Sequence, residues 1–275
     1  MEMPHHGRRV LAIGAHPDDV EIMCGGLMLE LQTLGCELHM ASLTLGDCGS
    51  IDQGADDIRR IRRGEAQAAA ALMGASYHSA GFNDFTIFVD DPSTRRVTAL
   101  LRDVDPFLVI THPPHDYLAD HEATSRLVRS ACFIAPAPNY STEAVSLLSR
   151  TSRIPYLYYA HPIEGVDVFG KPVTPQFYVD VDLVFDEKLR ALACHESQRS
   201  WLRAHHGVDE YLEAVRRWSL ELGRRASTIA RRRVPYAEAY RQHRGHAYPR
   251  DNVLAELLDA RVIDEPDWHQ ASERE

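Results

Sequence analysis

A dense group of polar side chains follows the first apolar stretch of the chain. His16, Asp18 and Asp19 come directly after residues 9–14, whose apolar character predicts a buried β-strand. If the chain turns at Pro17 into a helix, His16 and Asp19 lie at the carboxyl end of that strand. Open α/β sheets carry their chemistry at this edge. One imidazole and two carboxylates in four residues therefore indicate a metal site.

The two acids also have a purely structural interpretation. Near a helix N-terminus, backbone N–H groups and the helix dipole favour carboxylates, and Asp is a common N-cap residue. Capping does not require an imidazole, so His16 favours the metal interpretation.

A second polar cluster follows a second predicted strand. Residues 107–111 are apolar and β-branched, as in a buried parallel strand, and residues 122–128 have helical spacing. His121 therefore opens a helix after a strand, as Asp19 does. If the two strands are near neighbours, His16, Asp19 and His121 can form a three-ligand set with one open position. Two histidines and one carboxylate with a free position are a catalytic zinc arrangement, whereas four protein ligands close a structural site.

The five cysteines show no CxxC spacing, so we interpret them as buried small hydrophobic residues and not as ligands. They are Cys24, Cys36, Cys48, Cys132 and Cys194. Cysteines without an evident pairing pattern favour a reducing cytoplasm.

Five spaced motifs occur along residues 8–200. They are residues 15–21 with Gly25-Gly26, residues 44–50, residues 62–74, residues 116–121 and residues 188–198. In this order they resemble the zinc-dependent N-acetylglucosaminyl-phosphatidylinositol de-N-acetylases, known as the PIG-L or LmbE-like family.

The resemblance implies a role for each residue of the metal motifs. It implies that His16, Asp19 and His121 hold Zn²⁺ and that Asp18 is the general base. Bound zinc lowers the pKa of its water toward about 7 and polarises the carbonyl under attack. Asp18 is adjacent to a ligand yet free to point elsewhere, so it could take the proton of that water.

One position departs from the family pattern. Many members have His-Pro-Asp-His where this chain has Leu118-Ala119-Asp120-His121, and the first of those histidines is thought to assist the tetrahedral intermediate. Leucine transfers no proton, so that role is vacant or has moved. His195 is the best catalytic candidate because it falls in a matched motif. The other candidates, each with an ordinary core or surface interpretation, are His112, His115 and His161.

The resemblance implies an N-acetylated amino sugar as the substrate, free or joined to a lipid, a thiol-cofactor precursor or a natural-product scaffold. Candidate substrate contacts at matched positions are Asp47, Arg62, Asp116 and Tyr117. Arg62 could instead pair with Glu65 on its own helix, worth about 0.2–0.5 kcal/mol. Asp47 could instead stabilise a turn flanked by glycine.

Apolar runs alternate with helical patterns along the chain. Further strands are predicted at residues 38–43, 154–159 and 177–181, the last of them an outer strand, and a helix is predicted at residues 58–73. This alternation predicts an α/β fold with a Rossmann-like, doubly wound, mostly parallel sheet and helices on both faces.

The pattern becomes helical beyond about residue 200. We predict a deacetylase core over residues 1–200 and a helical C-terminal extension over residues 201–275, packed on the same domain. The extension could cover the active-site rim or pack between subunits with Trp201, Tyr211, Trp218 and residues 236–240.

Arginine clusters recur in this extension, at residues 216–217, 224–225 and 231–233. They could bind an acidic partner or a phosphorylated substrate, but a solvated or subunit-facing helix side is the favoured interpretation. We expect a homo-oligomer.

Composition sets the broad class. At 275 residues and 44% hydrophobic, the chain can bury one sizeable α/β core. Its net charge of −10 argues against nucleic-acid binding through phosphate neutralisation. No stretch approaches the roughly 18 apolar residues of a membrane span, and the first residues lack the apolar region of a signal peptide. We expect a cytoplasmic protein, and its arginine-dominated positive charge suggests a bacterial source.

Three functional hypotheses follow. The first is a zinc-dependent hydrolase that removes an N-acetyl group from an N-acetylglucosamine-type sugar or its conjugate. The second is a zinc-retaining sugar-binding or regulatory member with little or no turnover, which Leu118 supports and Asp18 opposes. The third is a Rossmann-type nucleotide-binding protein, against which the first strand leads to His-Pro-Asp-Asp and not to a G-x-G-x-x-G loop.

Overall fold

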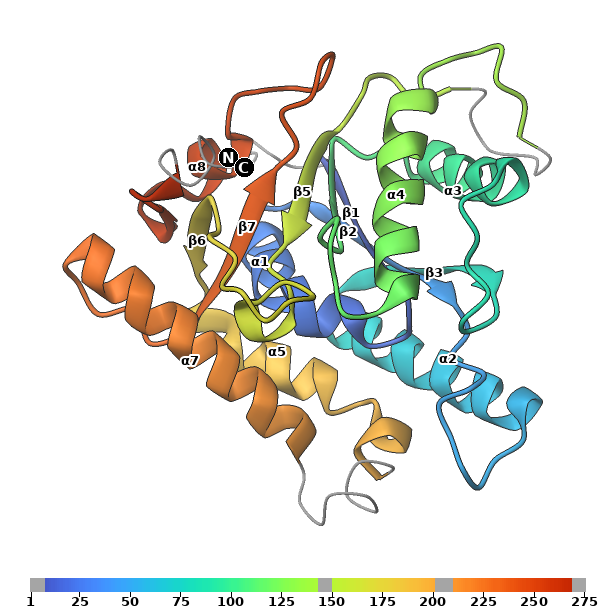
Figure 1. Ribbon diagram of the computed structural model, residues 1–275, viewed down its shortest axis with the longest axis horizontal. Helices are drawn as coiled ribbons and strands as arrows, with labels where there is room; N and C mark the ends of the chain where they lie inside the picture. Colours follow the sequence, from blue (N-terminus) through green and yellow to red (C-terminus); the bar gives the residue numbers. More distant parts are fainter. Residues whose placement is uncertain (1–7, 143–149, 201–209, 269–275) are drawn as a thin grey trace.

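One mixed sheet runs through the part of the chain that the computed structural model describes, residues 8–142, 150–200 and 210–268 (Figure 1). Its strands are β1 (Arg9–Gly14), β2 (Glu37–Thr44), β3 (Ala75–Phe82), β4 (Leu108–Thr111), β5 (Tyr156–Ala160), β6 (Phe177–Asp180), β7 (Ala237–Gln242) and β8 (Val262–Asp264). The α-helices are α1 (Asp19–Thr33), α2 (Ala55–Leu72), α3 (Asp91–Val104), α4 (Ala119–Ile134), α5 (Phe185–Leu192), α7 (Glu210–Ala230) and α8 (Val253–Leu258). Short 3₁₀ turns lie at Ile163–Gly165, Asp182–Val184 and Asp259–Arg261.

The sheet order is β3-β2-β1-β4-β5-β7-β6-β8, and β1 to β5 are parallel. The predicted α/β class with a mostly parallel, doubly wound sheet is confirmed. β1 pairs directly with β4, with Ile13 opposite Thr111, so the two strands that precede the polar clusters are neighbours. β6 is not the outermost strand, because β8 pairs with its free edge.

Helices cover both faces of the sheet because successive residues of a strand point to opposite sides. In β1, Val10 and Ala12 belong to the core under α1, α2 and α5, whereas Leu11 and Ile13 belong to the core under α3 and α4. Figure 1 shows α1 and α4 on opposite sides of the sheet. No helix in the described ranges is long and apolar enough to span a membrane.

The region after residue 200 is only partly helical. α7 is helical as predicted, but residues 237–242 form β7 in the interior of the sheet, antiparallel to β5 and β6. Alanine and glutamate are depleted in strands, so the segment gives a weak strand pattern, and long-range pairing decides its conformation. Whether residue 200 is a domain boundary stays a prediction, and Trp201 lies outside the described residues.

Glu238 of β7 joins this strand to α1. The helix is interrupted at Cys24, whose φ is −150° and ψ 16°, and the backbone N–H groups of Gly26 and Leu27 donate to the Glu238 carboxylate at 2.8 Å each. A Cβ on Gly26 would lie 2.7 Å from Val181 Cγ1, so glycine is required for this close approach. The Gly25-Gly26 motif therefore serves packing against the C-terminal strands.

Two predictions about surface and burial have mixed outcomes. Cys24, Cys36 and Cys132 are buried as predicted, but Cys194 is only partly buried, and Cys48 is exposed because it lies in the loop after β2. Some arginines of the clusters form ion pairs within the described residues. Arg225 binds Glu265 and Asp267, Arg232 binds Asp180, and Arg224 binds Glu221.

Candidate metal centre

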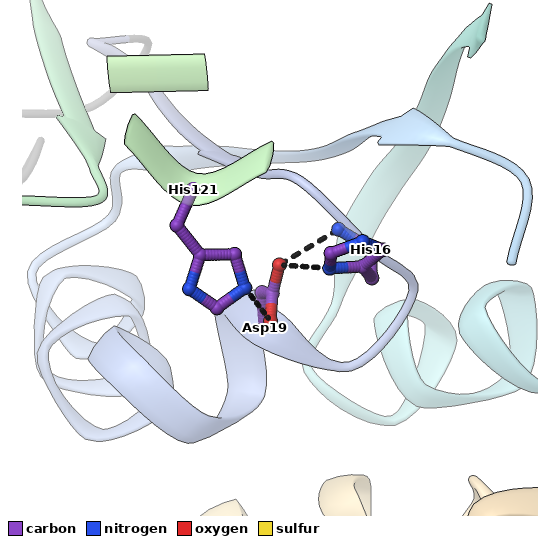
Figure 2. A group of neighbouring side chains, drawn as sticks. All are labelled: His16, Asp19 and His121. Carbon is purple, nitrogen blue, oxygen red and sulfur yellow. Dashed lines mark hydrogen bonds and ion pairs between the residues drawn. The ribbon is translucent and has the colours of Figure 1, made fainter. Parts of the chain in front are cut away.

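His16, Asp19 and His121 meet at the carboxyl ends of β1 and β4 (Figure 2). His16 lies in the turn after β1, Asp19 opens α1, and His121 lies in the first turn of α4. His16 Nδ1 lies 3.4 Å from Asp19 Oδ2, and His121 Nε2 lies 3.5 Å from Asp19 Oδ1. One ligand atom from each residue lies within 4.8 Å of the others, so the three could hold a metal ion.

The second nitrogen of each imidazole faces a buried carboxylate. His16 Nε2 lies 3.1 Å from Asp120 Oδ2, and His121 Nδ1 lies 3.0 Å from Asp116 Oδ1. Metal-binding histidines commonly use their other ring nitrogen in this way, which fixes the orientation of the ring. The donor set and its outer partners therefore fit a divalent metal such as zinc. Asp116, a predicted substrate contact, is buried and engaged with His121.

Charge is concentrated on these side chains. Burial lowers the pKa of His16, but its hydrogen bonds to Asp120 and Asp19 outweigh burial and raise the pKa to about 9. Burial likewise lowers the pKa of His121, but Asp19 and Asp116 raise it to about 10. Burial raises the pKa of Asp19, but His121 and His112 outweigh it and hold that pKa well below its usual range. The carboxylates thus carry the negative charge that a cation would neutralise.

Asp18 is held beside the ligands in an uncommon backbone conformation. Its φ is 116°, which is costly for a residue with a side chain and is found mostly at functional sites. Its Oδ2 accepts hydrogen bonds from Tyr211 Oη at 2.7 Å and from Arg62 Nη2 at 3.2 Å. Burial raises the pKa of Asp18, and Arg62 opposes that shift. Asp18 is the N-cap residue of α1, but its side chain makes no capping hydrogen bond, so capping does not account for this carboxylate.

Arg62 is buried against the first motif. Its Nη2 also donates to the carbonyl oxygen of Pro17 at 2.6 Å. The alternative pair with Glu65 is wrong, because the Glu65 carboxylate accepts from the backbone N–H and the hydroxyl of Ser197 at 2.7 and 2.6 Å. Gly46, at φ 74°, packs over Arg62, and a Cβ there would lie 2.6 Å from Arg62 Cδ.

Asp47 and Tyr117, the other predicted substrate contacts, differ in exposure. Asp47 Oδ1 accepts from the backbone N–H of Asp84 at 2.7 Å, and its Oδ2 accepts from Arg59 at 3.3 Å. The side chain therefore stabilises the loop after β2. Tyr117 is 68% exposed and meets the His121 ring edge-on at 5.4 Å between centroids. Tyr117 is therefore placed where a ligand could reach it.

His195 is fully buried and bound to α1. Its Nε2 lies 2.9 Å from Glu21 Oε1, and its Nδ1 has no hydrogen-bond partner among the described residues. Burial lowers the pKa of His195, but Glu21 outweighs burial and raises it.

The other candidate histidines lie at different distances from the ligands. His112 Nε2 lies 3.0 Å from Asp19 Oδ2, and its ring stacks on His121 at 3.9 Å between centroids. His115 is exposed, and His161 lines a separate cavity. The sequence position of His112 could have identified it as a site residue, because it directly follows a parallel strand, as the polar residues of the first motif do. Tyr211, expected either at the active-site rim or between subunits, binds Asp18, but no local signal identifies this partner, which is 193 residues away in the sequence.

Comparisons with known proteins identify relatives of this chain. Residues 11–132 match the family model described as PIG-L, GlcNAc-PI de-N-acetylase. The 4-oxalmesaconate hydratase of Pseudomonas putida is 24% identical, over 84% of this chain and 87% of the relative. A probable N-acetyl-alpha-D-glucosaminyl L-malate deacetylase 2 of Bacillus cereus is 29% identical, over 70% and 84%. The diacetylchitobiose deacetylase of Thermococcus kodakarensis is 26% identical, over 70% of each chain.

A solved structure supports the same fold. The 4-carboxy-2-hydroxymuconate hydratase GalB of Pseudomonas putida superposes with a TM-score of 0.72 at 24% identity, over 89% of this chain and 98% of that chain.

Proposed function

We propose that this chain, which belongs to the PIG-L family, is a zinc-dependent N-deacetylase acting on an N-acetylglucosamine-type amino sugar or its conjugate. The family predicted from the five sequence motifs is confirmed. The observation that carries the proposal is the convergence of His16, Asp19 and His121 beside Asp18, with an acid behind each imidazole. Two of the relatives named above are amino-sugar deacetylases.

The residues around the ligands suit amide hydrolysis. A zinc ion bound there would lower the pKa of a water toward about 7 and polarise the substrate carbonyl. Tyr211 and Arg62 both hold Oδ2 of Asp18, and Oδ1 makes no hydrogen bond to the described residues. Oδ1 is therefore available to take a proton from water and to return it to the departing amine nitrogen, which cannot leave as an anion near neutral pH.

The remaining roles follow from position. We assign His195 to stabilising the intermediate or orienting the sugar, through the nitrogen that Glu21 leaves free. We assign Asp116 and Asp120 to orienting the ligand imidazoles. Tyr117, by its exposure beside His121, is the strongest of the predicted substrate contacts. The expected homo-oligomer and cytoplasmic location stay predictions.

A hydratase is the second candidate function. The relative named a hydratase is aligned over 84% of this chain, against 70% for the two deacetylases. Addition of water to a carbon–carbon double bond forms no tetrahedral intermediate and expels no amine, so the histidine that the family usually has where Leu118 stands is not needed for those steps. The hydroxide adds to one carbon, and Asp18 could pass the proton of the water to the other. The same metal ligands and Asp18 could serve either reaction.

One experiment separates these functions. Metal content is measured on the isolated protein, which is then assayed for amine release from N-acetyl sugars and for loss of absorbance from unsaturated hydroxy-dicarboxylates. Amine release that disappears on metal removal and returns with zinc supports the deacetylase. Water addition without amine release favours the hydratase. Bound zinc and sugar with neither reaction supports the non-catalytic alternative.

A further inference from the structure

A cavity of about 270 Å³ lies at the same edge of the sheet as the metal centre. Its walls come from α1, α7, β7 and the segment after β5, and none of the three proposed ligands lines it. It is larger than the roughly 150 Å³ apolar cavity that is known to hold benzene in another protein. The cavity therefore has room for a group the size of a ring or a short chain.

Two helices lead from Asp18 to this cavity. Ile22 lines the cavity and donates its backbone N–H to the carbonyl oxygen of Asp18 at 3.1 Å. Val215 also lines it, one turn of α7 beyond Tyr211, whose hydroxyl binds Asp18. One helical turn is about 5.4 Å, so the cavity begins about one turn from Asp18, with Tyr211 at the border.

The cavity walls are mostly apolar, and their buried charges are paired. The apolar lining includes Ile22, Met23, Ile163, Val215, Trp218 and Leu222. The buried Lys188 and Glu238 also line it, but they bind each other at 2.6 Å, and their remaining bonds go to backbone groups of α1 and to the Tyr240 hydroxyl. Because this pair is neutral as a unit, it offers no counter-charge to a ligand. The two other charged lining residues, Glu164 and Glu221, are exposed to solvent, and Glu221 binds Arg224. The buried part of the walls therefore favours an uncharged occupant.

Two neutral polar groups border this space. The ring of His161 and the hydroxyl of Ser219 make no hydrogen bond within the described residues. Burial lowers the pKa of His161 to about 4, so the ring is neutral near pH 7 and offers one donor and one acceptor. An occupant with one hydroxyl or carbonyl oxygen would satisfy one of these groups.

We propose that this cavity is a substrate subsite for an uncharged, largely apolar group that carries one oxygen within reach of His161 or Ser219. The inference rests on the proposed deacetylase function and deepens it by naming the substrate class. The apolar group is either an aglycone on the sugar or an N-acyl chain longer than acetyl. Both sources present the same chemistry to the walls.

The first arm of the test does not depend on turnover. Binding of 1-hexanol to the metal-loaded protein is measured by ligand-observed NMR. Ser219→Leu fills the cavity and should weaken binding at least tenfold, while Thr228→Leu, an exposed hydroxyl residue of the same helix, should stay within twofold of wild type. Leu222→Asn makes the wall polar without filling it and should weaken binding several-fold, which covers the case that Ser219→Leu does not fold. Absence of hexanol binding, or equal binding by the wild type and the folded cavity variants, overturns the proposal.

The second arm identifies the source of the apolar group. kcat/KM for amine release is compared for methyl N-acetylglucosaminide, its hexyl glycoside and the methyl glycoside of N-hexanoylglucosamine. Each buried methylene is worth about fourfold, so we expect one longer substrate to exceed the methyl compound at least tenfold, and Ser219→Leu to remove that advantage.

The two failures are distinguishable. Turnover of the methyl compound with no preference for either longer substrate overturns the subsite and leaves the deacetylase standing. Hexanol binding that is sensitive to Ser219→Leu, without amine release from any compound, supports the cavity and overturns the proposed reaction.

Discussion

The parallel half of the sheet and the antiparallel half contribute to the site in different ways. In β1 and β4, polar residues follow the strand ends, so the topology alone brings His16, Asp19 and His121 to one edge. In the half that contains β6 to β8 and α7, single side chains reach across the molecule. Tyr211 binds Asp18, and Glu238 binds the amides of α1. The first half therefore places the reacting groups, and the second adjusts and encloses them.

The two halves also differ in how they treat charge. The metal centre gathers acids around imidazoles that offer nitrogen atoms to a cation. The antiparallel half buries Lys188 and Glu238 as a pair that is complete without a ligand. A variant in the first half should thus change metal binding or chemistry, whereas one in the second should change stability or positioning.

The largest effect is expected for Asp19→Ala. It removes one of three protein ligands, so the protein should lose its metal and its activity. Metal content by mass spectrometry and activity with added zinc measure this. Asp116→Asn is the matched control, since it alters only the partner of His121 and should weaken metal binding about 10- to 100-fold. Stoichiometric zinc in Asp19→Ala would rule out this ligand set.

Asp18→Asn should separate chemistry from metal binding. The ligands are unchanged, so zinc should stay, while loss of the general base should lower kcat/KM about 10²- to 10⁴-fold. Zinc content and amine release are measured on the same sample. A wild-type rate would exclude Asp18 as the base.

Glu238→Gln tests the antiparallel half. Removal of one charge from a buried pair leaves Lys188 uncompensated and should cost about 3–5 kcal/mol in the free energy of unfolding, measured by urea denaturation. Glu213→Gln, an exposed acid near Arg216, should cost less than about 1 kcal/mol. The double variant Glu238→Gln, Lys188→Met should recover part of the loss, because no charge is left unpaired. If it recovers nothing, the pair is not the source of the stability.

The same division explains what the sequence could predict. His16, Asp19 and His121 are identifiable because each lies directly after a strand or at a helix start, and parallel strand ends converge. β7 is missed because Ala237, Glu238 and Ala239 acquire their strand conformation from neighbours far away in sequence.

The partner of Arg62 is also decided by long-range contacts. The spacing along the helix suggests Glu65 as the partner of Arg62. In the structure, residues 196–200 pack so that Ser197 binds Glu65, and Arg62 binds Asp18 instead. Local patterns thus predict the metal ligands, whereas tertiary contacts determine which residues bind Asp18.

Tyr211→Phe should have a moderate effect that links the two halves. It removes one of two donors to Asp18 Oδ2 while Arg62 keeps the other. A hydrogen bond to a charged group is worth about 1.5–3 kcal/mol, and partial compensation by Arg62 leaves an expected fall in kcat of about tenfold. KM and zinc content should be unchanged, as befits a positioning residue. A raised KM with normal kcat would instead make Tyr211 a substrate contact.

The smallest effect is expected at Leu118, where the chain departs from the usual PIG-L pattern. Its backbone is extended, with φ −115° and ψ 127°, and its side chain is only partly buried, so Leu118→His should fold normally. The new imidazole would stand three residues before His121 and could protonate the leaving nitrogen, which Asp18 otherwise does alone. We expect kcat/KM for amine release to be unchanged or to rise a few-fold.

Leu118→Asn is the control for this last substitution, because it is polar but does not titrate near neutral pH. It should give no gain. His195→Ala, measured alongside, should slow the reaction less than Asp18→Asn does. A defect in His195→Ala as deep as that of Asp18→Asn, with zinc retained, would make His195 the essential acid. The proton would then reach the amine from the buried histidine beside Glu21, and the single-residue shuttle at Asp18 would be wrong.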